Sequence, residues 1–198
     1  MATQYSVAHR NATMTQLIAS IGINAQIIQY SGAVPANVGT APTGVLLVQF
    51  AGNATQFGTA TAGVLTASAV AGVNAAAAGI AGYYRINTSA GAAQSQGTVF
   101  QTTPLTTSTA TAANSNVLNF AATTGVVVGM TATGTGYPTG ALVIAVAATT
   151  VTINTVSTPG IAGATVITFG GDMNLTNTNI ASGQSCTFTS FTTTAFGA

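Results

Sequence analysis

Only three side chains in this chain of 198 residues carry a fixed charge. They are Arg10, Arg85 and Asp172; the sequence contains no Lys or Glu, and His9 is its single histidine. Charged residues make up 2% of the chain, against about 25% of an average soluble domain. This shortage removes most of the side chains that carry acid–base or metal chemistry. It also removes the charge that keeps free proteins dispersed, so the composition predicts a non-enzymatic protein packed into a larger assembly.

The rest of the composition excludes several other classes of protein. Apolar residues account for 47% of the chain, which excludes disorder caused by low hydrophobicity. A formal net charge of +1 leaves no basic patch, so we expect no nucleic-acid partner. The Ala- and Gly-rich window 63–81 lacks the density of Leu, Ile and Phe of a membrane-spanning helix, so we expect no membrane partner.

Two further features bear on the compartment of the protein. The start of the sequence shows no basic segment followed by an apolar run, so we expect no signal peptide. Cys186 is the single cysteine, and no intrachain disulfide can therefore form. We expect Cys186 to pack as a small apolar side chain; the alternative is an intermolecular disulfide.

Four apolar residues at helical spacing predict one amphipathic helix near the N-terminus: Met14, Leu17, Ile18 and Ile21. Asn11 or Thr13 is expected to cap the start of this helix, and Gly22 is expected to end it in the left-handed conformation.

The remaining sequence predicts β-structure, because short apolar or alternating segments are separated by Gly- and Pro-rich turns. In the first part we expect strands at 26–30, 45–50, 63–68, 82–87 and 98–101. A linker at 106–116, rich in Thr, Ser, Ala and Asn, separates these from strands expected at 117–120, 129–134, 140–147, 150–154 and 164–169. In the last part, 172–180 predicts a strand running into a turn, and 184–194 predicts a closing strand.

We therefore predict a mainly β fold, consisting of an antiparallel β-sandwich with one N-terminal α-helix and an inserted small β-barrel or sandwich. The sandwich domain is expected to be discontinuous and to comprise residues 1–103 and 170–198. The inserted β domain is expected to comprise residues 104–169. Such an insertion is physically reasonable, because surface loops tolerate added chain at a small cost in closure entropy.

Five short segments occur in a fixed order along the predicted sandwich: Arg10-Asn11-Ala12, 27–32 (IIQYSG), 41–48 (APTGVLLV), 84–86 (YRI) and 171–183 (GDMNLTNTNIASG). Together they resemble a family of structural proteins of tailed bacteriophages, over residues 8–101 and 170–194. Members of that family run almost directly from a segment like 97–99 to the Gly-Asp segment, whereas a long stretch intervenes here. This stretch is similar to small β modules of phage virion and tail proteins at 117–120 (VLNF), 125–130 (GVVVGM), 134–140 (GTGYPTG) and 151–154 (VTIN).

The resemblance implies a structural protein of the virion that is assembled in the host cytoplasm. We expect a capsid decoration or cement protein, which binds the major capsid protein, other copies of itself, or both, and stabilises the shell. One alternative is a tail, neck or fibre component. Another is a host-surface module that binds carbohydrate through Tyr137 in its Gly-rich loop, although a turn aromatic such as Tyr137 can instead pack on its own hairpin.

The sequence predicts no catalytic, cofactor-binding or metal site. Chemistry by paired carboxylates needs two acidic side chains, and the chain has one. The whole set of strong metal ligands is His9, Asp172 and Cys186, too few for a protein-only site. His9 is expected to be a surface residue close to the N-terminus.

The three charged residues are expected to have structural roles. Arg85 and Asp172 lie on predicted strands before and after the insertion, where we expect a partly buried ion pair; the alternative is two unrelated exposed ions. Arg10, near the start of the helix, gains nothing from the helix dipole and is expected to face a neighbouring subunit. Tyr137 is the second candidate for an interface contact.

Overall fold

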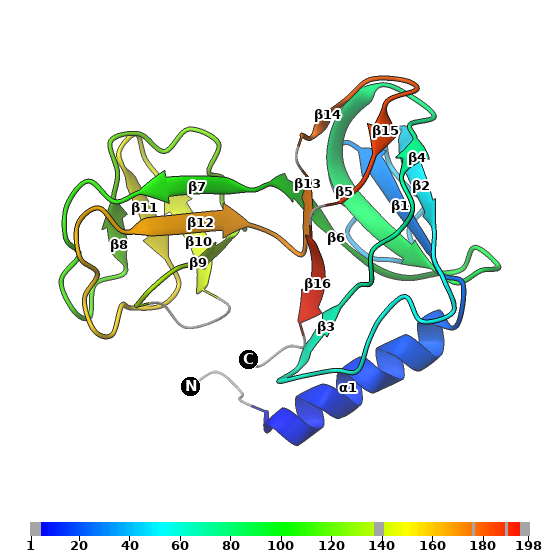
Figure 1. The fold of residues 1–198 in the computed structure, drawn as a ribbon, viewed down its shortest axis with the longest axis horizontal. Helices are drawn as coiled ribbons and strands as arrows, with labels where there is room; N and C mark the ends of the chain where they lie inside the picture. Colours follow the sequence, from blue (N-terminus) through cyan, green and yellow to red (C-terminus); the bar gives the residue numbers. More distant parts are fainter. Residues whose placement is uncertain (1–4, 137–140, 176, 189, 195–198) are drawn as a thin grey trace. The chain divides into compact units, whose positions relative to one another are not determined.

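The computed structural model describes residues 5–136, 141–175, 177–188 and 190–194. In this part the chain is mainly β, with one helix and antiparallel strand pairs (Figure 1). It divides into unit 1, Met1–Phe100 with Asp172–Ala198, and unit 2, Gln101–Gly171. The predicted fold class, a mainly β protein of sandwich type with one N-terminal helix, is confirmed.

Helix α1, Val7–Ile21, begins earlier than the sequence predicted, because Ser6 caps it. The Ser6 hydroxyl oxygen accepts a hydrogen bond from the His9 amide at 3.2 Å. The helix ends at Gly22 as predicted, but with a φ of 72° and a ψ of −169° this residue is extended and does not take the left-handed helical conformation that the sequence predicted. It runs beside strand β3 (Figure 1) and fully buries two of the predicted apolar side chains, Met14 and Ile21. Among the described residues, no helix has both the length and the apolar character needed to cross a membrane.

Unit 1 is built on an eight-stranded sheet in the order β2-β1-β5-β6-β13-β16-β3, and β14 pairs with β5 beside this path. Strands β4 and β15 form a separate two-stranded ribbon. The bounds are β1 Gln26–Ser31, β2 Leu46–Ala51, β3 Val64–Thr66, β4 Val73–Asn74, β5 Gly79–Asn87, β6 Ala93–Gln101, β13 Met173–Leu175, β14 Asn179–Ile180, β15 Ser185–Cys186 and β16 Ser190–Thr194.

Both faces of the β1–β5 pair carry buried apolar side chains, which alternate between the faces along each strand. We call the face toward the main core of unit 1 the inner face; Ile27 and Ile86 lie on it together with Tyr84. The opposite, outer face carries a second, smaller cluster of Ile28, Tyr30 and Tyr83.

Aromatic rings fill the centre of the main core. Phe191 of β16 meets the rings of Tyr84, Phe57 and Phe188 edge-on, at centroid distances of 4.7, 5.7 and 5.8 Å. Offset and edge-to-face pairs of this kind stabilise a core beyond simple area burial. Strand β16, which follows the insertion, is thereby packed against β5 and against Phe57, which precede it.

Unit 2 is a six-stranded antiparallel sheet in the order β7-β12-β9-β10-β11-β8. A bridge between Thr107 and Phe120 joins the chain just beyond the two outer strands, so the sheet closes into a small barrel. Leu118, Val151 and Phe169 are buried inside it. The bounds are β7 Thr103–Thr106, β8 Val117–Asn119, β9 Thr131–Thr133, β10 Ala141–Val146, β11 Thr150–Ile153 and β12 Val166–Gly170.

Two predictions about β segments also need correction. The segment 106–116 is part of the barrel and not a linker: Thr107 and Thr111 are 2% and 4% exposed. Burial of Thr107 is tolerated because its hydroxyl hydrogen-bonds to carbonyl oxygens, such as that of Ala162 at 3.2 Å. The predicted closing strand 184–194 is split into β15 and β16, which belong to different sheets.

Gly97 of β6 makes room for the ring of Tyr84, its register partner on β5. A Cβ at position 97 would lie 2.6 Å from the Tyr84 hydroxyl oxygen and 2.8 Å from two of its ring carbons. Because Phe191 fixes the ring, we expect Gly97→Ala to lower the free energy of unfolding by about 1–3 kcal/mol, as overpacking does. Urea denaturation measures this change.

The matched control is Gly58→Ala, since a Cβ at position 58 meets no atom within 4 Å. Equal stability of the two variants would contradict the packing described for Tyr84.

Candidate functional site

The predicted ion pair between Arg85 and Asp172 is wrong. Arg85 is 3% exposed, and its Nε and Nη2 donate to Gln96 Oε1 (3.1 Å) and to the Thr40 carbonyl oxygen (2.6 Å). Asp172 instead accepts a hydrogen bond from the Tyr84 hydroxyl at 3.2 Å. Tyr84 and Arg85 are consecutive residues of β5, so their side chains point to opposite faces of the sheet, and Asp172 lies on the Tyr84 side.

Tyr84 and Asp172 form a largely buried polar pair. Burial raises the pKa of the Asp172 carboxyl, and the hydrogen bond from Tyr84 lowers it by a smaller amount. Burial and the neighbouring carboxylate both raise the pKa of Tyr84. The phenol therefore stays protonated and acts as the donor in this pair.

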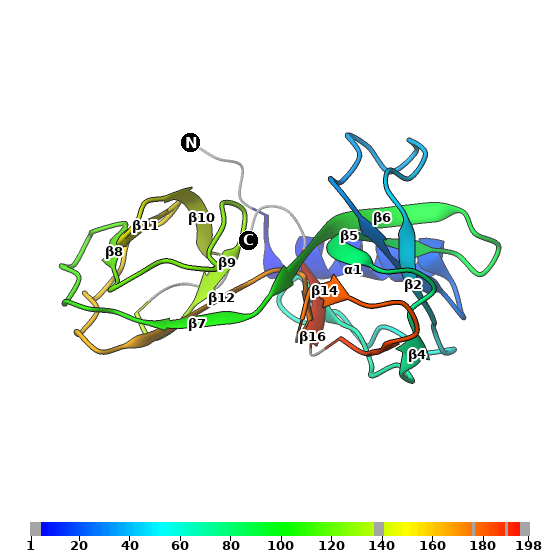
Figure 2. The same ribbon diagram turned by 90° about the horizontal axis from the view of Figure 1, so that it is seen from above.

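Arg85 belongs to a second polar arrangement on the outer face. Residues 32–45 connect β1 to β2 and cross this face; we call them the strap. Gln96 Nε2 donates to the Pro35 carbonyl oxygen at 2.7 Å. The Tyr83 hydroxyl accepts from the Thr43 amide and donates to the Thr43 carbonyl oxygen, both at 2.8 Å. In Figure 2 this light blue connection stands out from the sheet beside β5 and β6.

Of the two residues predicted to lie at an interface, Arg10 and Tyr137, the structure describes Arg10. The aliphatic part of Arg10 packs on Gly63, where an added Cβ would lie 2.8 Å from the Arg10 Cβ. Arg10 Nε is buried and has no hydrogen-bond partner in the described part of the chain. Part of the Arg10 side chain is therefore in contact with unit 1 itself. Its contact with a neighbouring subunit stays a prediction. Tyr137 lies outside the described residues.

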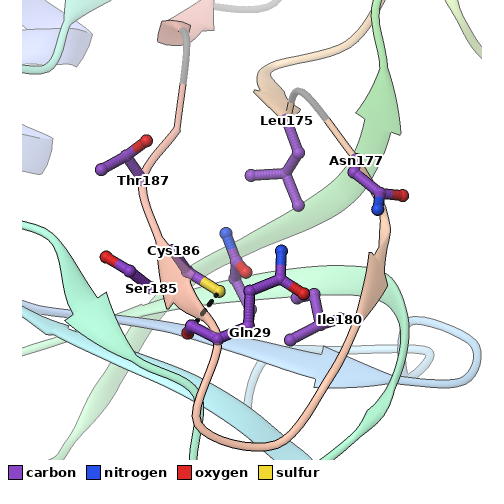
Figure 3. A pocket seen from close by; sticks show the side chains of 8 residues that line it. Gln29, Leu175, Asn177, Ile180, Ser185, Cys186 and Thr187 are labelled. Atoms are coloured by element: carbon purple, nitrogen blue, oxygen red, sulfur yellow. Dashed lines mark hydrogen bonds between the residues drawn. The ribbon is translucent and has the colours of Figure 1, made fainter.

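Unit 1 contains a small pocket of about 180 Å³ in which every lining side chain is neutral. Figure 3 shows Leu175, Asn177 and Ile180 on one side of it and residues of the β15 segment on the other. The full lining is Gln29, Leu175, Asn177, Ile180, Gln184, Ser185, Cys186 and Thr187.

Gln29, at the base of this pocket, is fully buried and incompletely hydrogen-bonded. Its Nε2 donates to the Met173 sulfur at 3.2 Å, and its Oε1 has no partner among the described residues. Because this oxygen is itself enclosed, it is a buried polar group of the core and not an open recognition group.

The reactive side chains are dispersed. Burial raises the pKa of the Cys186 thiol, which leaves it protonated and weakly nucleophilic. His9 is exposed on α1 and stacks on Tyr5, with ring centroids 4.7 Å apart. Within the described ranges, no group of three His, Cys, Asp or Glu side chains gathers to hold a metal ion. The polar groups described above connect segments of unit 1 to one another.

Sequence reasoning missed Gln29 and the attachment of the strap. A signal for Gln29 was present, since it interrupts the apolar run of β1. The strap was recognised as rich in turns, but its three attachment points at Pro35, Thr40 and Thr43 are main-chain groups, which leave no trace in a sequence. Comparison with protein-family models, with curated proteins and with solved structures finds no significant match.

The raised pKa of Asp172 makes a prediction for the pH dependence of stability. Below the ordinary pKa of about 4, the carboxyl is protonated in the folded and unfolded states, and burying it carries no charge penalty. As the pH rises through the higher folded-state pKa, the unfolded state releases its proton first, and stability is lost. We therefore expect the free energy of unfolding, measured in urea, to fall as the pH is raised from 3 to 7.

Asp172→Asn should flatten this profile, because an amide still accepts from Tyr84 but does not ionise. The chain has no other acidic side chain, so the profile reports mainly on Asp172. A wild-type protein that gains stability between pH 3 and 7, or a variant with the wild-type slope, would contradict this assignment.

Gln29→Met is expected to raise the free energy of unfolding by about 1 kcal/mol, because it replaces an unpartnered buried oxygen with an apolar group of similar size. Thermal or urea denaturation measures the effect. Gln49→Met on the adjacent strand is the matched control, since Gln49 is exposed. A destabilised Gln29→Met beside an unchanged Gln49→Met would contradict this prediction, because the hydrogen bonds of Gln29, including that from Nε2 to Met173, would then outweigh the cost of burying Oε1.

Proposed function

We propose that this chain is a non-enzymatic structural protein of a tailed-bacteriophage virion, and that it acts as a capsid decoration or cement protein. In this role it binds the major capsid protein, other copies of itself, or both, and stabilises the assembled shell. The proposal depends mainly on where the three charged side chains lie. The segments that resemble phage structural proteins also support it.

All three charged side chains are withdrawn from solvent to some degree. Arg85 is buried beneath the strap, Asp172 is largely enclosed beside Tyr84, and Arg10 is half-buried on Gly63. The surface is therefore close to neutral, and joining it to another surface removes few ions from water. The same neutrality is a disadvantage for a freely dispersed protein, which relies on net charge for solubility.

Exposed apolar side chains on each unit add to this support. Ile80 of β5 is 66% exposed in unit 1; Val128 and Ile144 are 60% and 51% exposed in unit 2. Burying such groups contributes about 25 cal/mol per Å² of apolar surface. When many copies bind one particle, weak contacts of this kind are multiplied by avidity.

Copy number in purified virions is the direct test. Quantitative mass spectrometry is expected to give a number of chains that scales with the number of capsid subunits. Cryo-electron microscopy is expected to place them on the icosahedral lattice. Shells depleted of this chain should then come apart at a lower temperature than complete shells.

Two results would contradict the proposal in different ways. A few copies at one vertex or along the tail would replace the capsid role with that of a tail, neck or fibre component. Absence of the chain from purified virions would overturn the structural role altogether.

A further inference from the structure

We propose that the strap, residues 32–45, opens and closes as a unit on two glycine hinges, and that Arg85 and Gln96 are the latch that holds it closed. The strap belongs to unit 1 alone, and its opening does not depend on the proposed function.

The length of the strap is the first indication. It joins β1 and β2, which are antiparallel neighbours in the sheet. About two to five residues suffice for such a connection, and long loops without secondary structure in compact domains are usually functional or disordered. The strap is neither a minimal turn nor detached, since it is bound to the outer face at three points.

The latch consists of two side chains from neighbouring strands. Arg85 and Gln96 are register partners on β5 and β6 and are hydrogen-bonded to each other. Arg85 then holds the Thr40 carbonyl oxygen, and Gln96 holds the Pro35 carbonyl oxygen. One connected pair therefore fixes two separate points of the strap, and Tyr83 fixes a third at Thr43.

Few apolar contacts support these bonds. Most strap residues are exposed, and Pro35 is its single fully buried residue. Beyond the base of the strap, where the Ser31 amide donates to the Val45 carbonyl oxygen, side chains make the strap-to-sheet bonds found among the described residues. Segments with few buried apolar contacts open at a lower free energy than the core that carries them.

A hinge lies at each end of the strap. Gly32 and Gly44 have φ values of 82° and 71°, in the left-handed region that favours glycine. A Cβ on Gly44 would overlap the Ser31 carbonyl oxygen, so a larger residue could not take its place. Hinges are typically a few residues at element ends that absorb a change in backbone angles.

Opening of the strap would expose part of the outer face of the sheet to solvent. The outer face beneath it carries the buried guanidinium of Arg85 and the stacked rings of Tyr30 and Tyr83, whose centroids are 5.1 Å apart. Arg85 is one of two arginines in the chain, and it has no carboxylate partner in the described structure. Its hydrogen bonds to Gln96 and to the strap provide partners for the guanidinium group in this buried position.

Amide hydrogen exchange followed by NMR tests the proposal at Thr43. The Thr43 amide donates to Tyr83 and touches neither latch residue. In the wild-type protein we expect its exchange rate to be independent of low urea concentrations, whereas amides of β1 and β5 accelerate with urea. Arg85→Met should speed exchange at Thr43 at least tenfold and leave the β1 and β5 amides unchanged.

Gln96→Met is a second latch variant, which leaves Arg85 in place and should also speed exchange at Thr43. It serves as the test if Arg85→Met does not fold. Arg10→Met is the matched control, because the other arginine packs on Gly63 and not on the strap. The proposal is overturned if Thr43 exchanges with the urea dependence of β5. It is also overturned if the latch variants affect Thr43 no more than Arg10→Met does.

Discussion

Unit 1 depends most on the contacts of one side chain, Tyr84. Its ring meets Phe191 of β16 edge-on, occupies the space left by Gly97 of β6, and places its hydroxyl on the carboxyl of Asp172. These contacts come from strands on both sides of the insertion, so a single residue joins the chain that precedes unit 2 to the chain that follows it. The polar end of the ring needs an acceptor when it is buried, which gives the one acidic side chain of the protein a structural purpose.

The next residue along β5, Arg85, serves the other face of the same sheet. Sequence reasoning recognised that Arg85 and Asp172 are significant but paired them with each other. The error has a physical cause: from Tyr83 to Asn87 every residue of β5 is buried, so the strand lacks the alternation of polar and apolar residues that reveals which side chains share a face. The sequence of a strand that is buried on both faces does not show which side chains share a face. The two polar arrangements can therefore be told apart only in the folded structure.

Much of the architecture was predictable, because local patterns determine it. The helical spacing of Met14 and Ile21 and the turn residues between strands gave the helix and most of the strands. The failures occur where tertiary contacts override local composition. Thr107 lies in a segment with the composition of a linker, but its hydroxyl bonds to carbonyl oxygens let it enter the barrel. Gln29 is a polar residue inside a core, which no propensity predicts.

The way in which the chain enters and leaves unit 2 bears on how such a protein diversifies. The first and last strands of the barrel, β7 and β12, are neighbours, and Thr103 lies directly opposite Phe169. Register partners of this kind have Cα atoms about 5 Å apart, so the chain enters and leaves the barrel at neighbouring points. A different domain whose two ends lie equally close together could therefore replace the barrel without a change in the sheet of unit 1.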